Sequence, residues 1–261
     1  MNDQPGVGPT DAATAALLTR FVQQVRSFLP VIVVWAHGSL AAGDYQPGRS
    51  DLDLVTVVGT AVTEAQQQRL QSMHDGLIKQ TKLGALLHCS YVHAATLAKV
   101  DHQHLTSAHQ QLLHRPLSPV TRRELLAGGL VLSGRAPGGL VPAVTDAELA
   151  EFVRADLRDY WRPATDRRRR WLRNVWVDLG LLTLARASVT LSDGRLISKR
   201  EALEVLVRLD APAALVADIR QRRYGPFRRA SPWWRLSQST ASSGSRTRSA
   251  APSSASSPLS K

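Results

Sequence analysis

Residues 37–54 have the sequence HGSLAAGDYQPGRSDLDL and lie between two apolar runs, VIVVWA at 31–36 and LVTVV at 54–58. Short β-branched runs bounded by glycine and serine predict two buried strands. Asp51 and Asp53 stand at the start of the second strand, where alternate side chains point to the same face. Because two adjacent carboxylates repel each other, this spacing predicts a cation between them. Mg²⁺, which binds carboxylate and phosphate oxygens, is the expected ion.

The positive charge of the chain is unevenly distributed. The net charge is +12, yet residues 1–150 hold 11 basic and 11 acidic side chains, so the whole excess lies in residues 151–261. Such asymmetry indicates an anionic partner: a nucleotide, a nucleic acid or an acidic surface. The alternative is an arginine-rich solvated surface without a partner.

The 261 residues, 43% of them hydrophobic, suffice for one large domain or two small ones. A single cysteine, Cys89, excludes an internal disulfide and suits a reducing compartment. The N-terminus lacks the features of a signal peptide, and no apolar run approaches the length of a membrane span. We therefore expect a cytoplasmic protein without membrane contact.

The hydrophobic pattern of the first half alternates helices with strands. We expect a helix over 11–29, strands at 31–36, 52–58 and 85–92, and a helix from the N-cap Thr63 to about Lys82. Short helices and turns are expected over 95–143. The sequence thus predicts a small mixed sheet covered by helices.

Beyond a Gly/Pro loop at 134–139 the pattern becomes wholly helical. Capping boxes at Thr145–Glu148 and Ser198–Glu201 begin two helices, the first ending at Pro163 and the second at Leu209. Further helices are expected over 166–187 and from Pro212 to Tyr224. The predicted organisation is a disordered N-terminus at 1–10, a first domain at 11–140, a helical domain at 144–230 and a disordered Ser-rich tail at 237–261.

The spacing of Gly38-Ser39, eleven residues and Asp51-Leu52-Asp53-Leu54 resembles the nucleotidyltransferase superfamily that includes polymerase-β-like enzymes. This resemblance implies an α+β fold, a polymerase-β-like domain followed by an all-α helical bundle. Gly38 would let a phosphate approach the backbone and Ser39 would donate a hydrogen bond to it. Ser50 is a further expected nucleotide-binding residue, and both aspartates would hold Mg²⁺ against ATP. The alternative is a pair of acids at a strand edge with no ion.

The fuller run HGSLAxGD…SDLD resembles the aminoglycoside 3''-O-adenylyltransferase family. The stretch LARASVTLSDGRLISK at 184–199 resembles the C-terminal helical domain of that family. There, an arginine and a lysine reach the nucleotide phosphates, and Arg186 and Lys199 fall on those two positions. A lysine in the first turn of a helix opposes the helix dipole, which favours a bound anion beside it. The alternative is an ordinary helical arginine and lysine.

Two features depart from the family pattern. Family members carry a third carboxylate on the third strand, whereas this chain has LHCSYV at 87–92, with His88 in that place and no acid between Asp75 and Asp101. Either His88 is the general base, a role that suits imidazole near neutral pH, or the site is impaired. The second departure concerns the acceptor. Aminoglycosides are polycations, so acidic residues are expected near them, yet residues 167–170 are four arginines. A cationic acceptor is therefore less expected than the family resemblance implies.

The sequence therefore predicts a nucleotidyltransferase that moves AMP from Mg·ATP to a hydroxyl of a small molecule. A streptomycin- or spectinomycin-like aminoglycoside, and with it antibiotic resistance, is the acceptor implied by the family. The predicted catalytic residues are Asp51, Asp53 and His88, in a monomer. The alternatives are a catalytically impaired nucleotide-binding protein, and nucleotidylation of a nucleic acid or protein.

Overall fold

The computed structural model describes residues 11–226. The predictions for the N-terminus at 1–10 and the tail at 237–261 fall outside these residues. Contacts among the described residues group 11–224 into one compact unit, called the first unit, and residues 225–226 belong to a second. All helices and strands of the described residues lie in the first unit.

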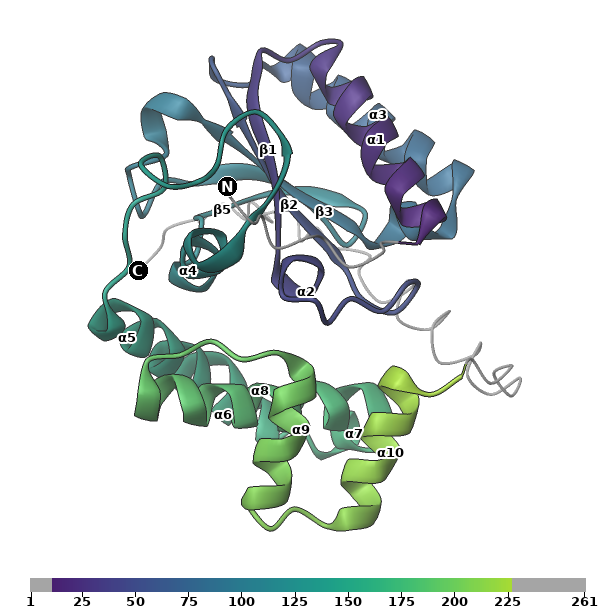
Figure 1. The fold of residues 1–261 in the computed structure, drawn as a ribbon, viewed down its shortest axis with the longest axis vertical. Helices are drawn as coiled ribbons and strands as arrows, with labels where there is room; N and C mark the ends of the chain where they lie inside the picture. The colour runs from purple at the N-terminus through teal and green to yellow at the C-terminus, as the bar shows by residue number, and fades with distance from the viewer. Residues whose placement is uncertain (1–10, 227–261) are drawn as a thin grey trace, which may run out of the picture. The chain divides into compact units, whose positions relative to one another are not determined.

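A six-stranded sheet forms the first half of this unit (Figure 1). Its order is β5-β4-β3-β2-β1-β6, with β2 and β3 parallel and every other neighbouring pair antiparallel. The strands are β1 (Val31–His37), β2 (Leu52–Val58), β3 (Leu87–His93), β4 (His104–Ala108), β5 (Gln111–Arg115) and β6 (Leu130–Ser133). The predicted mixed sheet is confirmed, with more strands than expected.

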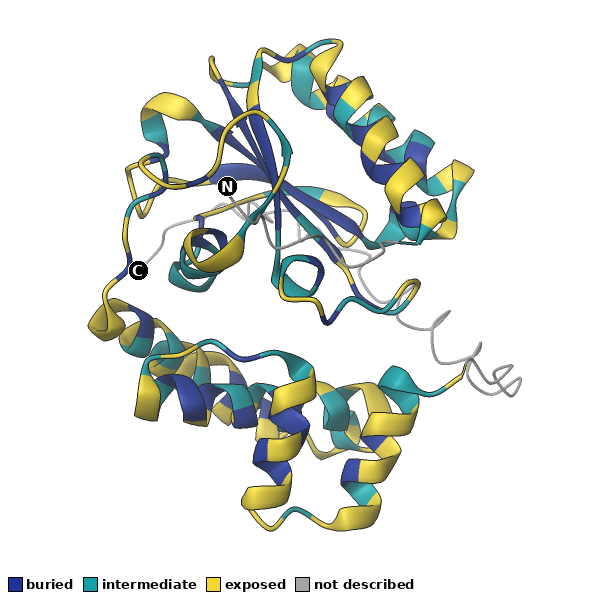
Figure 2. Cartoon of the chain, viewed as in Figure 1, coloured by how far each residue is buried: buried dark blue, intermediate teal, exposed yellow. Residues whose placement is uncertain are grey.

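Helices cover both faces of the sheet. On one face, α1 (Ala12–Arg26) and α3 (Glu64–Gln80) bury Phe21 and Leu70 against alternate residues of β1 and β2 (Figures 1 and 2). On the other face, α4 (Pro119–Gly128) packs Leu125 against Trp35, which is fully buried. Alternation along the strands therefore divides the core into two layers. The short helices of this half are α2 (Gly38–Ala41), η1 (Lys82–Leu86) and η2 (Ala94–Thr96).

The prediction of helices and turns over 95–143 is wrong in part, because β4, β5 and β6 lie there. The turn between β4 and β5 places His109 and Gln110 at φ values of 50° and 64°. Glycine or asparagine is usual at such positions, so this hairpin carries no ordinary turn signal. The strands themselves are short, and HLTSA at 104–108 has one large apolar side chain.

The second half of the unit is helical, as predicted. Its helices are α5 (Asp146–Asp156), the π-helical turn η3 (Leu157–Trp161), α6 (Arg162–Thr165), α7 (Arg168–Trp171), α8 (Asn174–Asp193), α9 (Lys199–Arg208) and α10 (Ala213–Tyr224). Both predicted capping boxes are present, at Thr145 and Ser198, and a third begins α3 at Thr63. The core of this half includes Leu182, Ala185, Leu203 and Ile219.

Two helix boundaries differ from the predicted ones. Pro163 does not end its helix: at the π-helical turn the Arg162 amide donates to the Leu157 carbonyl, five residues back, and α6 follows directly. Such turns interrupt the regular hydrogen-bond ladder, where a proline would otherwise clash. The helix predicted over 166–187 is broken between α7 and α8. Trp171 folds over Gly180, where a Cβ would lie 2.6 Å from the indole ring.

By length and composition, α8 is apolar enough to cross a membrane, contrary to the sequence-based expectation. Gly180, Leu182 and Ala185 of this helix are nevertheless buried, and α8 contacts α5, α7 and α9. One face of α8 therefore packs in the helical half of the unit, while a third of its apolar stretch is buried in total.

Substituting His74 is expected to change how stability depends on pH. His74 is buried and its Nε2 lies 2.7 Å from the Tyr91 hydroxyl; burial lowers the pKa of His74 to about 4. In the unfolded chain the imidazole of His74 takes up a proton near pH 6.5, whereas in the folded protein it does so only near pH 4. The free energy of unfolding therefore falls by about 3 kcal/mol as the pH is lowered from about 6.5 to about 4. His74→Gln should therefore lose less stability than the wild type when urea unfolding is measured between about pH 7.5 and about pH 4.5. Parallel pH profiles for the two proteins would contradict this assignment.

Candidate functional site

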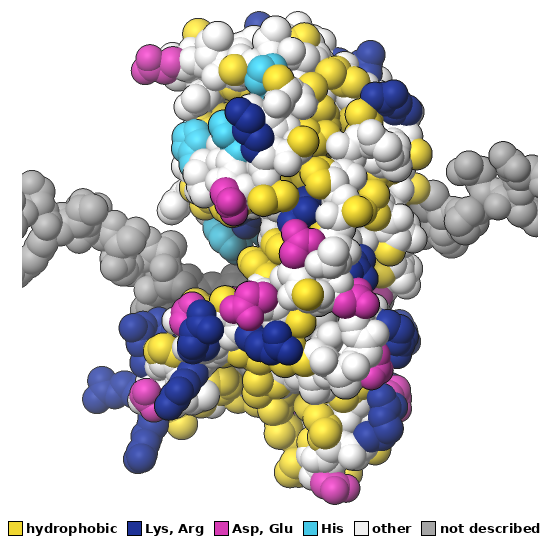
Figure 3. Space-filling model, turned by 90° about the vertical axis from the view of Figure 1, so that its left-hand side faces the viewer, with side chains coloured by type: hydrophobic (Ala, Val, Ile, Leu, Met, Phe, Trp, Pro, Cys, Tyr) yellow, Lys and Arg dark blue, Asp and Glu magenta, His cyan; other side chains and the backbone are white. Residues whose placement is uncertain are grey.

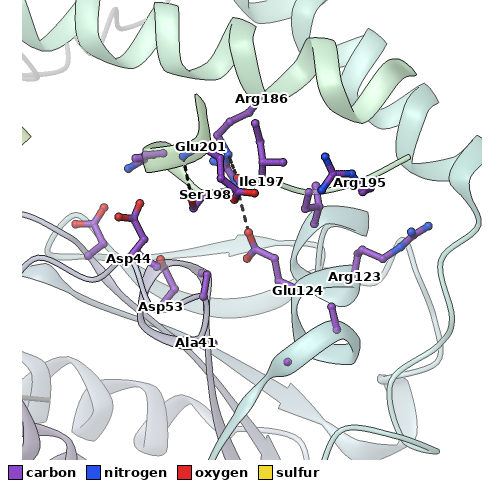
Figure 4. A pocket seen from close by; sticks show the side chains of 18 of the residues that line it. Ala41, Asp44, Asp53, Arg123, Glu124, Arg186, Arg195, Ile197, Ser198 and Glu201 are labelled. Carbon is purple, nitrogen blue, oxygen red and sulfur yellow. Dashed lines mark hydrogen bonds and ion pairs between the residues drawn. The ribbon is translucent and has the colours of Figure 1, made fainter. Parts of the chain in front are cut away.

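A cavity of about 560 Å³ lies between the sheet and the helical half of the first unit (Figure 4). It is bounded by α2, the segment before β2, α4, residues 194–198, the start of α9 and the end of α10. The charged residues that line it are Asp44, Asp51, Asp53, Glu124, Glu201, Arg123, Arg186, Arg195, Lys199 and Arg223. Both signs of charge therefore meet in one concave site, located between two parts of the fold, where ligand sites commonly occur.

Three residues of neighbouring strands form one row beneath this cavity. In the register of the sheet, His37 pairs with Asp53, and Asp53 pairs with His88. Paired residues of adjacent strands point to the same face. Asp53 is therefore flanked by a histidine on each side, on the face that α4 covers.

The two aspartates that the sequence singled out lie at the cavity wall and have opposite pKa shifts. Asp51 lies just before β2; desolvation raises its pKa, and the charge of Asp53 adds to this. For Asp53, desolvation is outweighed by the interaction with His88 and by the charges of His37 and Lys199, so its pKa is lowered. Asp53 is thus held as an anion at neutral pH.

This donor set fits a hard divalent cation. Two carboxylates face one cavity, and the residues at 11–226 contain no group of three or more His, Cys, Asp and Glu side chains arranged to hold a metal. Mg²⁺ commonly binds through one or two carboxylates and takes its other ligands from phosphate and water. The residues present therefore suit an ion that arrives with a nucleotide.

Gly38 lies against the Asp53 carboxylate. Its φ is +63°, and a Cβ at this position would lie 2.9 Å from Oδ2 of Asp53. A side chain is therefore excluded both by the backbone conformation and by the close approach. Ser39 follows in α2 and also lines the cavity.

Arg186 and Lys199 enter the cavity from the helical half. The Arg186 Nε donates to the Ile197 carbonyl at 2.8 Å, which fixes the side chain across the loop before α9. Within the described part of the chain, the Lys199 ammonium group makes no hydrogen bond to protein. Desolvation lowers the pKa of Lys199, and the positive charges of Arg223 and Arg186 lower it further. A bound anion would relieve this repulsion.

Two predicted site residues are not among those that line the cavity. Ser50 is buried, and its Oγ accepts hydrogen bonds from the Gln46 amide at 3.0 Å and from Arg223 at 3.4 Å. His88 lies beside Asp53 on the neighbouring strand β3, with Nδ1 3.6 Å from Oδ1 of Asp53. Its ring is 4.8 Å from that of His109 in the β4–β5 turn.

The structure adds Glu124 and Asp44, which the sequence did not single out. Glu124 of α4 accepts a hydrogen bond from His37 at 2.8 Å and lies 3.5 Å from Arg186 (Figure 4). It therefore links the sheet to the helical half. The region of α4 was expected to hold short helices and gave no residue-level signal. Asp44 is buried and stands within the motif quoted for the family resemblance.

Comparisons with known proteins agree with this fold. Residues 18–108 match the family model of the nucleotidyltransferase domain. The structure is similar to that of spectinomycin adenyltransferase AAD(9) from Enterococcus faecalis with ATP and spectinomycin, with a TM-score of 0.64, 14% identity, and coverage of 82% of this chain and 92% of the other. A toxin–antitoxin with AMP-PNP gives a TM-score of 0.28 at 12% identity over 58% of this chain and 92% of the other, too low to support an argument. No curated protein sequence matches. The chain therefore has a nucleotidyltransferase fold, with a mixed sheet followed by helices.

Proposed function

We propose that this protein transfers AMP from Mg·ATP to a hydroxyl group of a small molecule. The observation that carries the proposal is the pairing of opposite charges across one cavity. Asp51 and Asp53 lie on the sheet side with Gly38 against them, and Arg186 and Lys199 face them from the helical half. This arrangement suits a metal-bound triphosphate, whose charge must be neutralised from more than one direction.

Each residue has a defined part in the proposal. Asp51 and Asp53 would hold Mg²⁺, which polarises the phosphate when bound. Gly38 and Ser39 would bind phosphate at the start of α2. Arg186 and Lys199 would neutralise the triphosphate, and Ser50 would act indirectly through Arg223.

His88 is the proposed general base. The acceptor oxygen would form a bond to the α-phosphorus, pyrophosphate would leave, and the hydroxyl proton would pass toward His88. The position of His88 beside Asp53 supports this role. The burial of His88, which does not line the cavity, supports the alternative, a nucleotide-binding protein with impaired chemistry.

The acceptor is proposed to be small and hydroxyl-bearing. The similar adenyltransferase was solved with spectinomycin, which makes aminoglycoside-type acceptors the first candidates. The other cavity carboxylates are already engaged: Glu124 by His37, Asp44 by Tyr224, and Glu201 by the Ser198 amide. We therefore expect acceptors with few positive charges to be favoured over strongly polycationic ones.

The arginine run at 167–170 does not line the cavity, and Arg167, Arg168 and Arg169 are exposed. Figure 3 shows Lys and Arg side chains gathered over the helical half on one face of the molecule. This placement suits a solvated surface. Nucleotidylation of a nucleic acid remains an alternative, and a steep loss of affinity with salt would identify it.

Pyrophosphate release tests the proposal. Wild type and Asp51→Ala are incubated with Mg·ATP and with spectinomycin, streptomycin, and uncharged or anionic sugars. Release that depends on an acceptor and is lost in Asp51→Ala would support the transferase. Binding of Mg·ATP without release for any acceptor would support the impaired alternative, whereas unchanged release by Asp51→Ala would refute the site.

A further inference from the structure

A buried carboxylate, Asp44, lies on the cavity wall opposite α9 and α10. Its side chain is 4% exposed. The Tyr224 hydroxyl donates to it, at 2.9 and 3.0 Å from its two oxygens, and the Arg200 amide donates at 3.2 Å. Buried carboxylates are retained only where such donors compensate for lost water.

Two arginines complete the surroundings of Asp44. Arg200 and Arg223 each place a guanidinium nitrogen 3.7 Å from the carboxylate. Both also lie near the Tyr224 ring, with Cζ at 4.4 Å for Arg200 and 5.4 Å for Arg223. The ring therefore carries cation–π contacts in addition to its hydroxyl bond.

The end of α10 also holds the segment that leads into β2. Arg49 donates to the Arg223 carbonyl at 2.7 Å, and Arg223 donates to the Ser50 Oγ at 3.4 Å. We define the Asp44 cluster as Asp44, Arg49, Ser50, Arg200, Arg223 and Tyr224. It joins residues 44–50 to the start of α9 and the end of α10.

The cluster lies directly beside the proposed nucleotide site. Ser50 precedes Asp51, and Arg200, whose amide is bound by Asp44, follows Lys199. We infer that Asp44 and Tyr224 are positioning residues, which hold Lys199 opposite Asp51 and thereby set the affinity for a nucleoside triphosphate. This inference rests on the proposed function.

The helical half has an independent attachment to the sheet, so the cluster is not needed merely to keep the two together. Arg123 of α4 donates to the Val144 carbonyl at 2.7 Å, to Asp146 at 2.8 Å and to the Gly194 carbonyl at 3.4 Å. Glu124 adds its contact with Arg186. Loss of one hydroxyl at Tyr224 should therefore leave the fold intact and change the position of Lys199.

Tyr224→Phe tests the inference because it removes the hydroxyl and keeps the ring. Calorimetric titration of the full chain with Mg·ATP should show a Kd raised about tenfold, the usual effect of losing a hydrogen bond to a charged group. Asp44→Asn, which keeps an acceptor but removes the charge, should change the Kd in the same direction. Thermal melts of each variant would establish that it is folded.

A double-mutant cycle separates positioning from general loosening. In a Lys199→Ala background, Tyr224→Phe should change the Kd by less than about twofold, because the side chain it positions is gone. The control is Arg220→Gln, since Arg220 also joins α10 to α9, through Glu204 at 2.8 Å, without touching residues 44–50. This control should leave the Kd unchanged.

The outcomes are distinguishable. Equal effects of Tyr224→Phe in both backgrounds, or an unchanged Kd in both Tyr224→Phe and Asp44→Asn, would overturn the inference and leave the proposed function standing. Absence of Mg·ATP binding by the wild type would overturn both.

Discussion

Asp53→Asn is expected to lower the rate of nucleotidyl transfer by at least about 10³-fold, because metal-ion stabilisation contributes several kcal/mol and each 1.4 kcal/mol is tenfold. Asparagine has the same shape and removes the charge. Burial alone would raise the pKa of Asp53, but its neighbours lower the pKa by more, so the surroundings favour the anion. Single-turnover measurements with Mg·ATP and an acceptor would give the rate.

Two controls accompany this measurement. Asp75→Asn removes a carboxylate on α3 that bonds Gln71 and does not line the cavity, and it should leave transfer unchanged. Urea unfolding at neutral pH should show Asp53→Asn to be folded but somewhat less stable than the wild type, because the lowered pKa of Asp53 means that its surroundings favour the anion. If Asp53→Asn transferred the nucleotide at the same rate as the wild type, Asp53 would be excluded as a metal ligand.

The parts of the molecule that the sequence predicted are those determined locally. The two strands around residues 37–54 and the caps at Thr63, Thr145 and Ser198 follow from the hydrophobic pattern or from side chains three residues apart. Local rules of this kind need no knowledge of the tertiary structure.

The parts that it did not predict depend on distant residues. Glu124 meets His37 and Arg186 only because α4 packs on the sheet beside the helical half. Asp44 meets Tyr224 across 180 residues of chain. Such long-range pairings carry no periodic signal, and only the assembled fold brings their members together. The β4–β5 hairpin is local, and it was missed for a different reason: His109 occupies a position where glycine is usual.

His88→Ala is expected to reduce kcat by about 10²-fold to 10⁴-fold, a much larger effect than the one it has on the Kd for Mg·ATP. The asymmetry follows from position. His88 does not line the cavity, so its loss removes no direct contact from the entering nucleotide and affects Mg·ATP binding through the pKa of Asp53, which His88 helps to lower. A general base removes the proton of the acceptor hydroxyl during the chemical step, so its loss lowers kcat.

His88→Glu distinguishes the two alternatives for this residue. A carboxylate here would restore the family pattern and would stand beside Asp53, with which it pairs in the sheet. If His88 is a working base, the variant should be no faster than the wild type, because the added negative charge raises the pKa of Asp53 and weakens its preference for the anion. Activity that appears in His88→Glu and is absent from the wild type would instead identify the natural protein as a nucleotide-binding relative that has lost its base. Rates and Mg·ATP affinities for wild type, His88→Ala and His88→Glu, measured with one acceptor, decide between these two accounts.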